Sequence, residues 1–381
     1  MPLLRAAAEG RHELGGARID QAQVEFAVRA GLGPLLNHVT RDDPAALSHL
    51  SRALLAGADM AGEALYRGQT TALAEILEAG GEIADDVTLL KGISVCRHYP
   101  CPHLRTMNDI DLLVSPAGLP RLEALLREMG YRRDKYGMEP GFYREHHHSR
   151  PFVHPQTNVR LEAHRALFPA DRRLPDHSAL SVSAASTQTV SGRLEGMVVR
   201  RFGPELELVY LAAHWAYDCH LPLVYAGLLD AIYLLRNDGE RIDWDLIGAW
   251  CECREVATPL CVLLGYLMRH GLVDRGEVIV AMLDEAPKSV GRFGTRALHR
   301  IVGRCLEGGF RDDSASKEVL EIVWQALVAP GAAWTKAFAV PFGVVFPPRH
   351  PDRFSPALQL HRVRSLLRRC LGGQAGGRGA R

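Results

Sequence analysis

The alternation of apolar and polar positions divides the chain into helical and strand-like segments. Leucines recur at helical spacing over residues 47–55, directly after Asp43–Pro44, a capping carboxylate and a ring that together favour a helix start. A second helix is predicted over 73–77. It should end at Gly80–Gly81, because glycine adopts a left-handed turn at little cost. The pattern therefore predicts an N-terminal helical segment, residues 1–81.

Between residues 82 and 202 the pattern changes to short β-prone runs. Strands are predicted over 87–90, 110–114 and 159–164, with hairpin or irregular β structure over 131–157 and further β structure over 190–202. Lys91–Gly92 is predicted to form a turn after the first of these strands. Ser115–Pro116 repeats the cap-plus-proline signal, and the apolar stripe that follows it predicts a helix ending at Gly130.

Helical spacing returns from Glu205 onward, and Ile242-Asp243-Trp244 is typical of a helix start. The chain is therefore predicted to have an α+β fold, a small mixed β-sheet core flanked by helices at both ends. The predicted organisation is 1–81 helical, 82–202 α/β core, 203–371 helical, and 372–381 a Gly-rich, basic, disordered tail.

The composition is that of an ordinary soluble globular protein: 47% of the 381 residues are hydrophobic and 23% are charged. The net charge of +1 predicts no general attraction to nucleic acid. No segment reaches the ~18 apolar residues of a membrane span. The cysteines are scattered without a CxxC pair, and the N-terminus lacks a secretory signal, so a cytoplasmic location is predicted.

Two carboxylates in the predicted strand over 110–114 are the first candidates for chemistry. Because side chains alternate across a strand, Asp109 and Asp111 share one face, while Ile110 and its alternating neighbours can enter the core. Like charges this close repel each other unless a cation lies between them. Mg²⁺ prefers such oxygen ligands and shares them with substrate phosphates. The pair therefore predicts a metal site.

The strand over 159–164 offers a third acid by the same alternation. Arg160, Glu162 and His164 lie on its polar face. If this strand lies beside the first, Glu162 completes a three-carboxylate site that can hold two metal ions ~3.5–4 Å apart for phosphoryl transfer. His164 would either face this site or cap the strand.

These segments together resemble a known family. The Lys91–Gly92 turn, the block from Arg105 to Val114, the strand Leu161–His164 and the later Ile242-Asp243-Trp244 resemble the uncharacterised nucleotidyltransferases of the polymerase-β-like superfamily, over roughly residues 45–365. The resemblance implies a minimal nucleotidyltransferase core wrapped by helices. It implies Asp109 and Asp111 as the metal-binding pair, Glu162 as the third acid, and a nucleoside triphosphate as substrate.

The resemblance also suggests roles around the acids. Asp109, Asp111 and Glu162 would be the catalytic residues and would hold Mg²⁺ or Mn²⁺. The expected nucleotide- and phosphate-binding residues are Lys91, Gly92, Ser94, Arg105 and Asn108. The superfamily's usual Gly-Gly or Gly-Ser is Gly92-Ile93-Ser94 here, so the hydroxyl is displaced by one position. The acceptor, which could be a small molecule, a peptide or a protein, would offer a hydroxyl or a phosphate.

A run of histidines, His146-His147-His148, also suggests metal binding. Consecutive strand residues point to opposite faces, so only His146 and His148 are expected to act together. A structural zinc site needs four ligands, and no cysteine lies nearby. His146 and His148, with Arg160 and His164, are therefore candidates to face the substrate, and His164 keeps the second position, as the cap of its strand. His214 and Trp215 lie in an apolar helix and are expected in the core.

Two other functions compete with nucleotidyl transfer. A glycosyltransferase also uses an acid–x–acid motif to bind a metal and a nucleotide diphosphate, but it needs a nucleotide-binding α/β half before that motif. Here the preceding chain is predicted to be helical. A non-catalytic nucleotide-binding module is the second competitor, and the three intact acids weigh against it.

Overall fold

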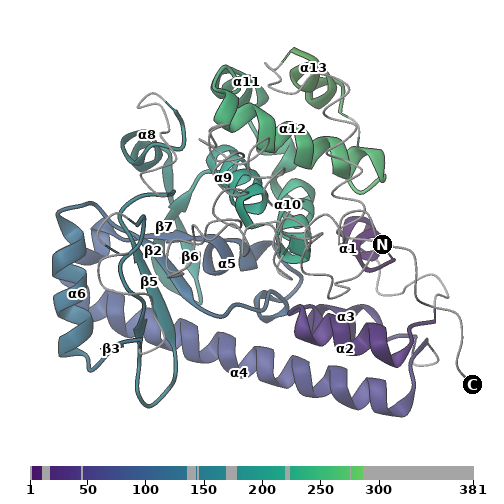
Figure 1. Cartoon of the computed structure of the whole chain (residues 1–381), viewed down its shortest axis with the longest axis horizontal. Helices are drawn as coiled ribbons and strands as arrows, with labels where there is room; N and C mark the ends of the chain where they lie inside the picture. Colours follow the sequence, from purple (N-terminus) through teal and green to yellow (C-terminus); the bar gives the residue numbers. More distant parts are fainter. Residues whose placement is uncertain are drawn as a thin grey trace, which may run out of the picture.

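The fold is α+β, as predicted: helices flank a mixed β-sheet on both sides (Figure 1). The computed structural model describes residues 2–10, 18–43, 46–134, 143, 146–168, 178–218, 224–274 and 276–285. The sheet has seven strands in the order β3-β4-β5-β2-β1-β7-β6. Its strands are β1 Thr88–Leu90, β2 Ile110–Leu113, β3 Arg132–Arg133, β4 Phe152–Val153, β5 Arg160–His164, β6 Thr189–Leu194 and β7 Met197–Phe202.

The three central strands are those predicted over 87–90, 110–114 and 159–164. β2 runs antiparallel to β1 and parallel to β5. The predicted β region over 190–202 is the β6–β7 hairpin. The predicted irregular β structure over 131–157 contains the short strands β3 and β4. The hydrophobic pattern therefore identified the three central strands individually, and the other four only as regions of β structure.

The N-terminal segment is helical, with α1 Pro2–Glu9, α2 Gln21–Arg29, α3 Gly33–Val39 and α4 His49–Gly80. Two details of the prediction were wrong. The two helices expected before residue 80 are one helix of 32 residues. This helix starts at His49, because Ser48, and not Asp43, caps it by accepting a hydrogen bond from the Ser51 N–H. The predicted end at Gly80–Gly81 is confirmed; Gly81 has a φ of 50°.

Short helices connect the strands: α5 Lys91–Val95, α6 Gly118–Glu128 and α8 Val182–Thr187, with 3₁₀ turns η2 Gly81–Asp86, η3 Cys96–His98 and η4 Pro102–Leu104. Lys91–Gly92 is therefore the first turn of a helix and not an isolated turn. The helix predicted from Ser115–Pro116 begins only at Gly118, because Ser115 is held by Asp86 outside the helix. Its hydroxyl still accepts the Gly118 N–H at 3.0 Å.

The C-terminal half is helical throughout its described part. It contains α9 Pro204–Asp218, α10 Val224–Asp238, η6 Gly239–Arg241, α11 Trp244–Trp250, α12 Arg254–Arg269 and α13 Glu277–Glu285. Asp243 caps α11 by accepting the Leu246 N–H at 3.0 Å, which confirms the helix start predicted at Ile242-Asp243-Trp244. The predicted tail 372–381 lies outside the described residues.

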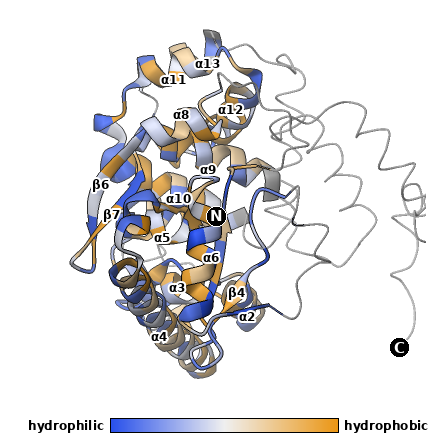
Figure 2. Cartoon of the chain, turned by 90° about the vertical axis from the view of Figure 1, so that its left-hand side faces the viewer, coloured by the Kyte–Doolittle hydropathy of each residue, from blue (hydrophilic) through white to orange (hydrophobic). Residues whose placement is uncertain are grey.

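The two faces of the central strands enter different hydrophobic clusters. Ile110 and Leu112 of β2 pack in the cluster that contains the buried faces of α4 and α6. Leu113 points to the opposite face, where its cluster includes α9, α10 and α12 (Figure 1). Figure 2 shows hydrophobic residues gathered where α9 and α10 meet this side of the sheet. Asp111 must therefore face α9 and α10, on the side away from α4.

The cluster on the α9–α10 side also includes residues of α1 to α3, so both ends of the described chain share one core. The domain boundaries proposed from the sequence stay a prediction. In the described part of the chain, no helix combines the length and the hydropathy that crossing a bilayer requires. The compartment stays a prediction as well.

Helix α4 provides a direct test of the packing. Leu73 is fully buried against the sheet, whereas Leu50 on the same helix is 52% exposed. We expect Leu73→Ala to lower the free energy of unfolding by about 3 kcal/mol, from lost burial and the cavity left behind. Leu50→Ala should change it by less than about 0.5 kcal/mol. Urea unfolding measures both, and equal losses would contradict the assigned orientation of α4.

Candidate active site

Strand register brings the predicted acids together. In the β2–β5 pair, Asp111 lies directly beside Glu162. In the β1–β2 pair, Asp111 lies opposite Leu90, the residue before Lys91. Asp109 precedes β2 by one residue. The sequence predicted a three-carboxylate site only if the strand of Glu162 lies beside the strand of Asp111. The pairing of β2 with β5 meets this condition.

These side chains line a cavity of about 370 Å³ between the sheet and helices α9 and α10. Its polar wall includes the three acids with Lys91, Arg105 and Asn108, and Leu211 and Trp215 of α9 form part of an apolar wall. Its other lining residues are Gly92, Thr106, Met107, His146, His147, His148, His214, Gly227 and Asp230. The cavity therefore contains most of the site residues predicted from the sequence.

Asp111 is the most firmly held of the acids. Its Oδ1 accepts hydrogen bonds from Lys91 Nζ at 3.1 Å and His164 Nε2 at 2.7 Å, and its side chain is buried. Burial alone would raise the pKa of Asp111, but Lys91 and the hydrogen bond from His164 lower it well below its usual range. Asp111 is therefore ionised. His164, which the sequence placed either at the site or at the end of the strand, contacts the site through Asp111, but it is fully buried and is not among the residues that line the cavity.

Asp109 has the opposite electrostatic environment. Burial, with the charges of Asp111 and Glu162, raises the pKa of Asp109 to about 7. Glu162 lies 3.4 Å from Arg160 and 3.6 Å from His148, measured between the charged atoms. At Asp109, burial and the charges of the two other acids together outweigh the attraction of Lys91, which is the electrostatic situation that a bound cation relieves.

The segment after β1 has an unusual backbone. Lys91 has a φ of 50°, a left-handed conformation that costs a residue with a side chain about 1 kcal/mol or more. This conformation begins α5 and accompanies the ion pair between Lys91 and Asp111. At Gly92, an added Cβ would lie 2.7 Å from Met107 Cγ. The absence of a side chain at Gly92 therefore makes room for Met107. Gly92 also lines the cavity with its backbone.

Three predicted ligand-binding residues have other partners. Ser94 is buried and its hydroxyl donates to Glu207 Oε1 at 2.5 Å, so it does not line the cavity. Arg160 also lies outside the cavity lining and pairs with Asp134 at 2.7 Å. Arg105 does line the cavity, but its guanidinium binds both oxygens of Asp230, at 2.7 and 2.9 Å.

The histidine run differs from the expectation of strand alternation. His146, His147 and His148 all line the cavity, and their ligand atoms lie within 4.8 Å of one another. The expectation that only His146 and His148 could act together was wrong. Residues 146 and 147 lie in a bend, where the alternation of side chains along a strand does not apply. Of the three histidines, His148 is the one in a β-bridge, which it forms with His164. Buried His147, which lines the cavity, is therefore an additional candidate site residue.

Helices α9 and α10 contribute residues that the sequence did not indicate. Asp230 of α10 is 2% exposed and holds both Arg105 and the hydroxyl of Tyr99. An acid inside the apolar run 226–235 was the signal that could have identified it. His214 and Trp215 were expected in the core; Trp215 is buried, and both side chains also line the cavity.

The donor atoms fit a divalent cation. One oxygen each from Asp111 and Glu162 and one nitrogen of His164 lie within 4.8 Å of one another. Asp109 lines the same cavity and interacts electrostatically with both acids. Carboxylate oxygens are the ligands that Mg²⁺ and Mn²⁺ prefer. The residues present thus fit the metal that the sequence predicted.

The buried histidines should make the stability depend on pH in the absence of metal. Burial, with neighbouring His164, lowers the pKa of His147. Below pH ~6.5 this side chain is protonated in the unfolded chain but neutral in the folded one. The folded state therefore binds fewer protons, and its stability falls as the pH falls through that value.

His147→Gln should remove this contribution. Between pH 6.5 and 5.5, we expect the free energy of unfolding of the variant to fall less steeply than that of the wild type. The difference between the two slopes is about 1.4 kcal/mol per pH unit at most. Urea unfolding at several pH values in EDTA gives the slope. Exposed His49→Gln is the control and should retain the wild-type slope. An unchanged slope in His147→Gln would contradict the neutral, buried state of this histidine.

Comparison with known proteins agrees with this geometry. The profile of a protein family described as uncharacterised nucleotidyltransferase matches residues 20–270, which include the sheet, the cavity and the helices that close it. No curated protein and no solved structure matches the chain. The match covers well over half of the sequence. The chain therefore belongs to the uncharacterised nucleotidyltransferase family.

Proposed function

We propose that the protein is a metal-dependent nucleotidyltransferase that moves a nucleoside monophosphate from a nucleoside triphosphate to an acceptor hydroxyl or phosphate. The observation that supports this most is the convergence of Asp109, Asp111 and Glu162 on one cavity beside Lys91. Family membership supports the reaction class. The carboxylates and the cavity support a metal and a phosphate ligand.

Asp109 and Asp111 would hold the Mg²⁺ that accompanies the triphosphate, with Glu162 completing the set of oxygen ligands. When bound, the metal would neutralise charge on the triphosphate and on the departing pyrophosphate. Lys91 fixes the orientation of Asp111 and adds positive charge beside it. Asn108, which is exposed at the cavity wall, is available to bind the ligand.

The acceptor oxygen would attack the α-phosphorus, and the bond from that phosphorus to the bridging oxygen of pyrophosphate would break. The acceptor, if it is a hydroxyl, loses its proton during this step. Glu162 would take this proton, because Asp111 Oδ1 already accepts hydrogen bonds from Lys91 and His164, whereas the Glu162 carboxylate is held less closely, by Arg160 at 3.4 Å. His148, 3.6 Å from Glu162, would stabilise the carboxylate position.

The two walls of the cavity suit the two parts of a nucleotide. The acids and Lys91 lie on the strand side, where phosphates and metal would bind. Leu211 and Trp215 of α9 lie on the helical side, where an apolar surface would accept the base. Arg105 would present its guanidinium to the ligand from a fixed position at the cavity wall, because both oxygens of Asp230 hold it there and offset its charge.

A glycosyltransferase is the less well supported alternative. It requires a nucleotide-binding α/β half before the acid–x–acid motif. In the described residues before β1, the chain forms helices and 3₁₀ turns. A module that binds nucleotide without turnover would keep the same cavity, and only an activity measurement separates it from an enzyme.

The test is incubation of the protein with each nucleoside triphosphate labelled at the α-phosphate, with Mg²⁺ or EDTA, in extract fractions as the source of acceptor. We expect a labelled product and pyrophosphate release that EDTA abolishes. Glu162→Gln should abolish both, and Glu128→Gln, an exposed acid at the end of α6, should not. Transfer from labelled nucleotide sugars instead would support the glycosyltransferase. Nucleotide binding without pyrophosphate release would support the non-catalytic module.

A further inference from the structure

A second cavity, of about 580 Å³, is rich in arginine. Arg97, Arg201, Arg236 and Arg241 line it, together with His98 and Asp238. These residues come from η3, from strand β7, and from α10 and the turn after it. None of the four arginines lines the cavity that contains the three acids. This arginine cavity therefore differs in position and in charge from the proposed active site.

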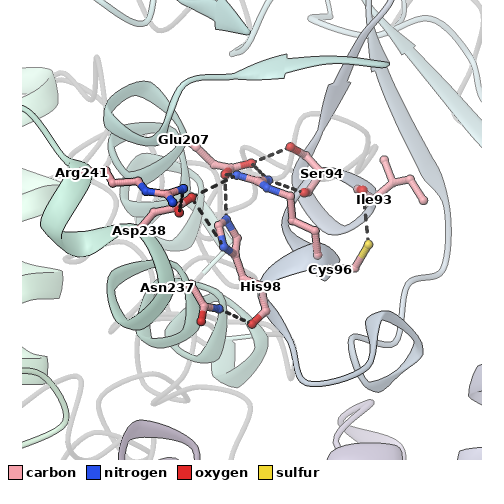
Figure 3. Close-up of polar contacts among 9 residues, drawn as sticks. Ile93, Ser94, Cys96, His98, Glu207, Asn237, Asp238 and Arg241 are labelled. Atoms are coloured by element: carbon pink, nitrogen blue, oxygen red, sulfur yellow. Dashed lines mark hydrogen bonds and ion pairs between the residues drawn. The ribbon is translucent and has the colours of Figure 1, made fainter. Parts of the chain in front are cut away.

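Two of the arginines have carboxylate partners. Arg97 binds Glu207 Oε2 at 2.7 Å and lies 3.8 Å from Asp238, and Arg241 lies 3.4 Å from Asp238. Figure 3 shows Glu207 and Asp238 converging on His98, with Ser94 also bound to Glu207. This network fixes the floor of the cavity. The four arginines that line the cavity therefore outnumber the two carboxylates of this network, Glu207 and Asp238.

The other two arginines have no carboxylate within ion-pair distance in the described part of the chain. Arg236 donates to the Ala7 carbonyl at 3.2 Å. Arg201 has a buried Nε without a hydrogen-bond partner, and burial with nearby Arg97 lowers the pKa of Arg201. An unpaired cation in such a position is stabilised by an anion.

Glycines make room for both of these arginines. A Cβ added at Gly192 would lie 2.7 Å from Arg201 Nε, and one added at Gly10 would lie 1.8 Å from an Arg236 guanidinium nitrogen. Gly192 lies opposite Val199 in the β6–β7 hairpin, two residues from Arg201. Gly10 is itself one of the residues that line the cavity, and Gly192 leaves room for the guanidinium of Arg201, which lines it.

We propose that the arginine cavity binds the phosphate groups of a second, small ligand, separate from the nucleotide that the acidic cavity would hold. Guanidinium groups bind phosphate oxygens through paired hydrogen bonds, and several of them fit an oligophosphate better than a single phosphate. The volume admits either inorganic pyrophosphate or the phosphates of a whole nucleotide. Both sources offer the same chemical group, linked phosphates.

A chain of hydrogen bonds connects the two cavities. Tyr99 lines the arginine cavity, and its hydroxyl donates to Asp230 at 2.6 Å. Asp230 in turn holds Arg105 at the wall of the acidic cavity. Occupancy of the arginine cavity would therefore act on a residue that positions part of the proposed active site.

Isothermal titration of the full chain in EDTA with pyrophosphate, ATP and inorganic phosphate tests the proposal. We expect pyrophosphate to bind, and Arg201→Gln to weaken it at least about tenfold, the equivalent of one lost charge-assisted hydrogen bond. Arg193→Gln removes the same charge from an exposed position on the same hairpin and should leave binding unchanged. If ATP and pyrophosphate bind with equal affinity, the cavity recognises the phosphates alone. If ATP binds more tightly than pyrophosphate, the ligand is a nucleotide.

Lys91→Ala distinguishes the two cavities. It removes one of two cationic side chains, Lys91 and Arg105, that line the acidic cavity, and it should leave pyrophosphate binding in EDTA unchanged. The proposal would be overturned if Lys91→Ala weakened pyrophosphate binding as much as Arg201→Gln does. It would also be overturned if none of the three anions bound to the wild type. Arg241, with an 80% exposed side chain, offers a second variant should Arg201→Gln not fold: Arg241→Ala should weaken binding about threefold. Neither outcome depends on nucleotidyl transfer.

Discussion

Asp111→Asn and Asp109→Asn are each expected to lower Mg²⁺-dependent nucleotidyl transfer by roughly a thousandfold or more, because each removes a charged metal ligand. Their effects on stability should differ. Asp111 is the ionised partner of Lys91, at 3.1 Å, whereas the raised pKa of Asp109, about 7, keeps that acid protonated at pH 6 in the absence of metal. Asparagine therefore resembles the native state of Asp109 and not that of Asp111.

In EDTA at pH 6, we expect Asp111→Asn to lower the free energy of unfolding by about 3–5 kcal/mol, the cost of a buried cation that has lost its partner. Asp109→Asn should change it by less than about 1 kcal/mol. Urea unfolding measures stability, and pyrophosphate release measures activity. Asp42→Asn, on an exposed turn, is the control for both. Turnover retained in both variants, or equal destabilisation by them, would refute these roles.

Asp230→Ala should be among the most destabilising single changes in the molecule. It would leave the guanidinium of Arg105, whose side chain is 15% exposed, without either of its two carboxylate bonds, and the Tyr99 hydroxyl without its acceptor. Breaking a buried pair from one side costs about 3–5 kcal/mol. We expect a loss of that size in urea unfolding, and weaker nucleotide binding because Arg105 is no longer held at the cavity wall.

A double variant separates this explanation from a simple packing defect. Arg105→Met removes the cation that Asp230→Ala leaves unpaired, so the double variant should be more stable than Asp230→Ala alone. The matched acid Asp238 is the last residue of the same helix, and its side chain is 17% exposed. Asp238→Ala should be the milder change, because Arg97 retains Glu207. Additive losses in the double variant would contradict the ion-pair account.

Hydrophobic periodicity was sufficient to predict the central strands and the side of β2 that carries Asp111. Ile110 and Leu112 enter the core with α4 and α6, and a period of two then fixes the opposite side for the acid. The sequence could not show that Asp111 and Glu162 are adjacent, because strand order depends on contacts between distant segments. The register of β2 with β5 shows that they are.

Residues outside regular strands were predicted less well, for identifiable reasons. Alternation excluded His147, but 146 and 147 lie in a bend, where alternation does not apply. Ser94 was placed near phosphate by motif position, yet α5 turns its hydroxyl to Glu207, an acid of α9 more than a hundred residues away. The role of Asp230 follows from tertiary contact with Arg105, which local sequence does not encode.

The central claim is that Asp109, Asp111 and Glu162 hold a cation in one cavity. Anomalous diffraction from crystals soaked with Mn²⁺ and a non-hydrolysable nucleoside triphosphate tests it most directly, because manganese is located by its own scattering. The account predicts a peak within coordinating distance of Asp111 and Glu162, with the triphosphate on the same side as Lys91. A peak bound only by His146, His147 and His148, or a cavity without metal at saturating Mn²⁺, would contradict it.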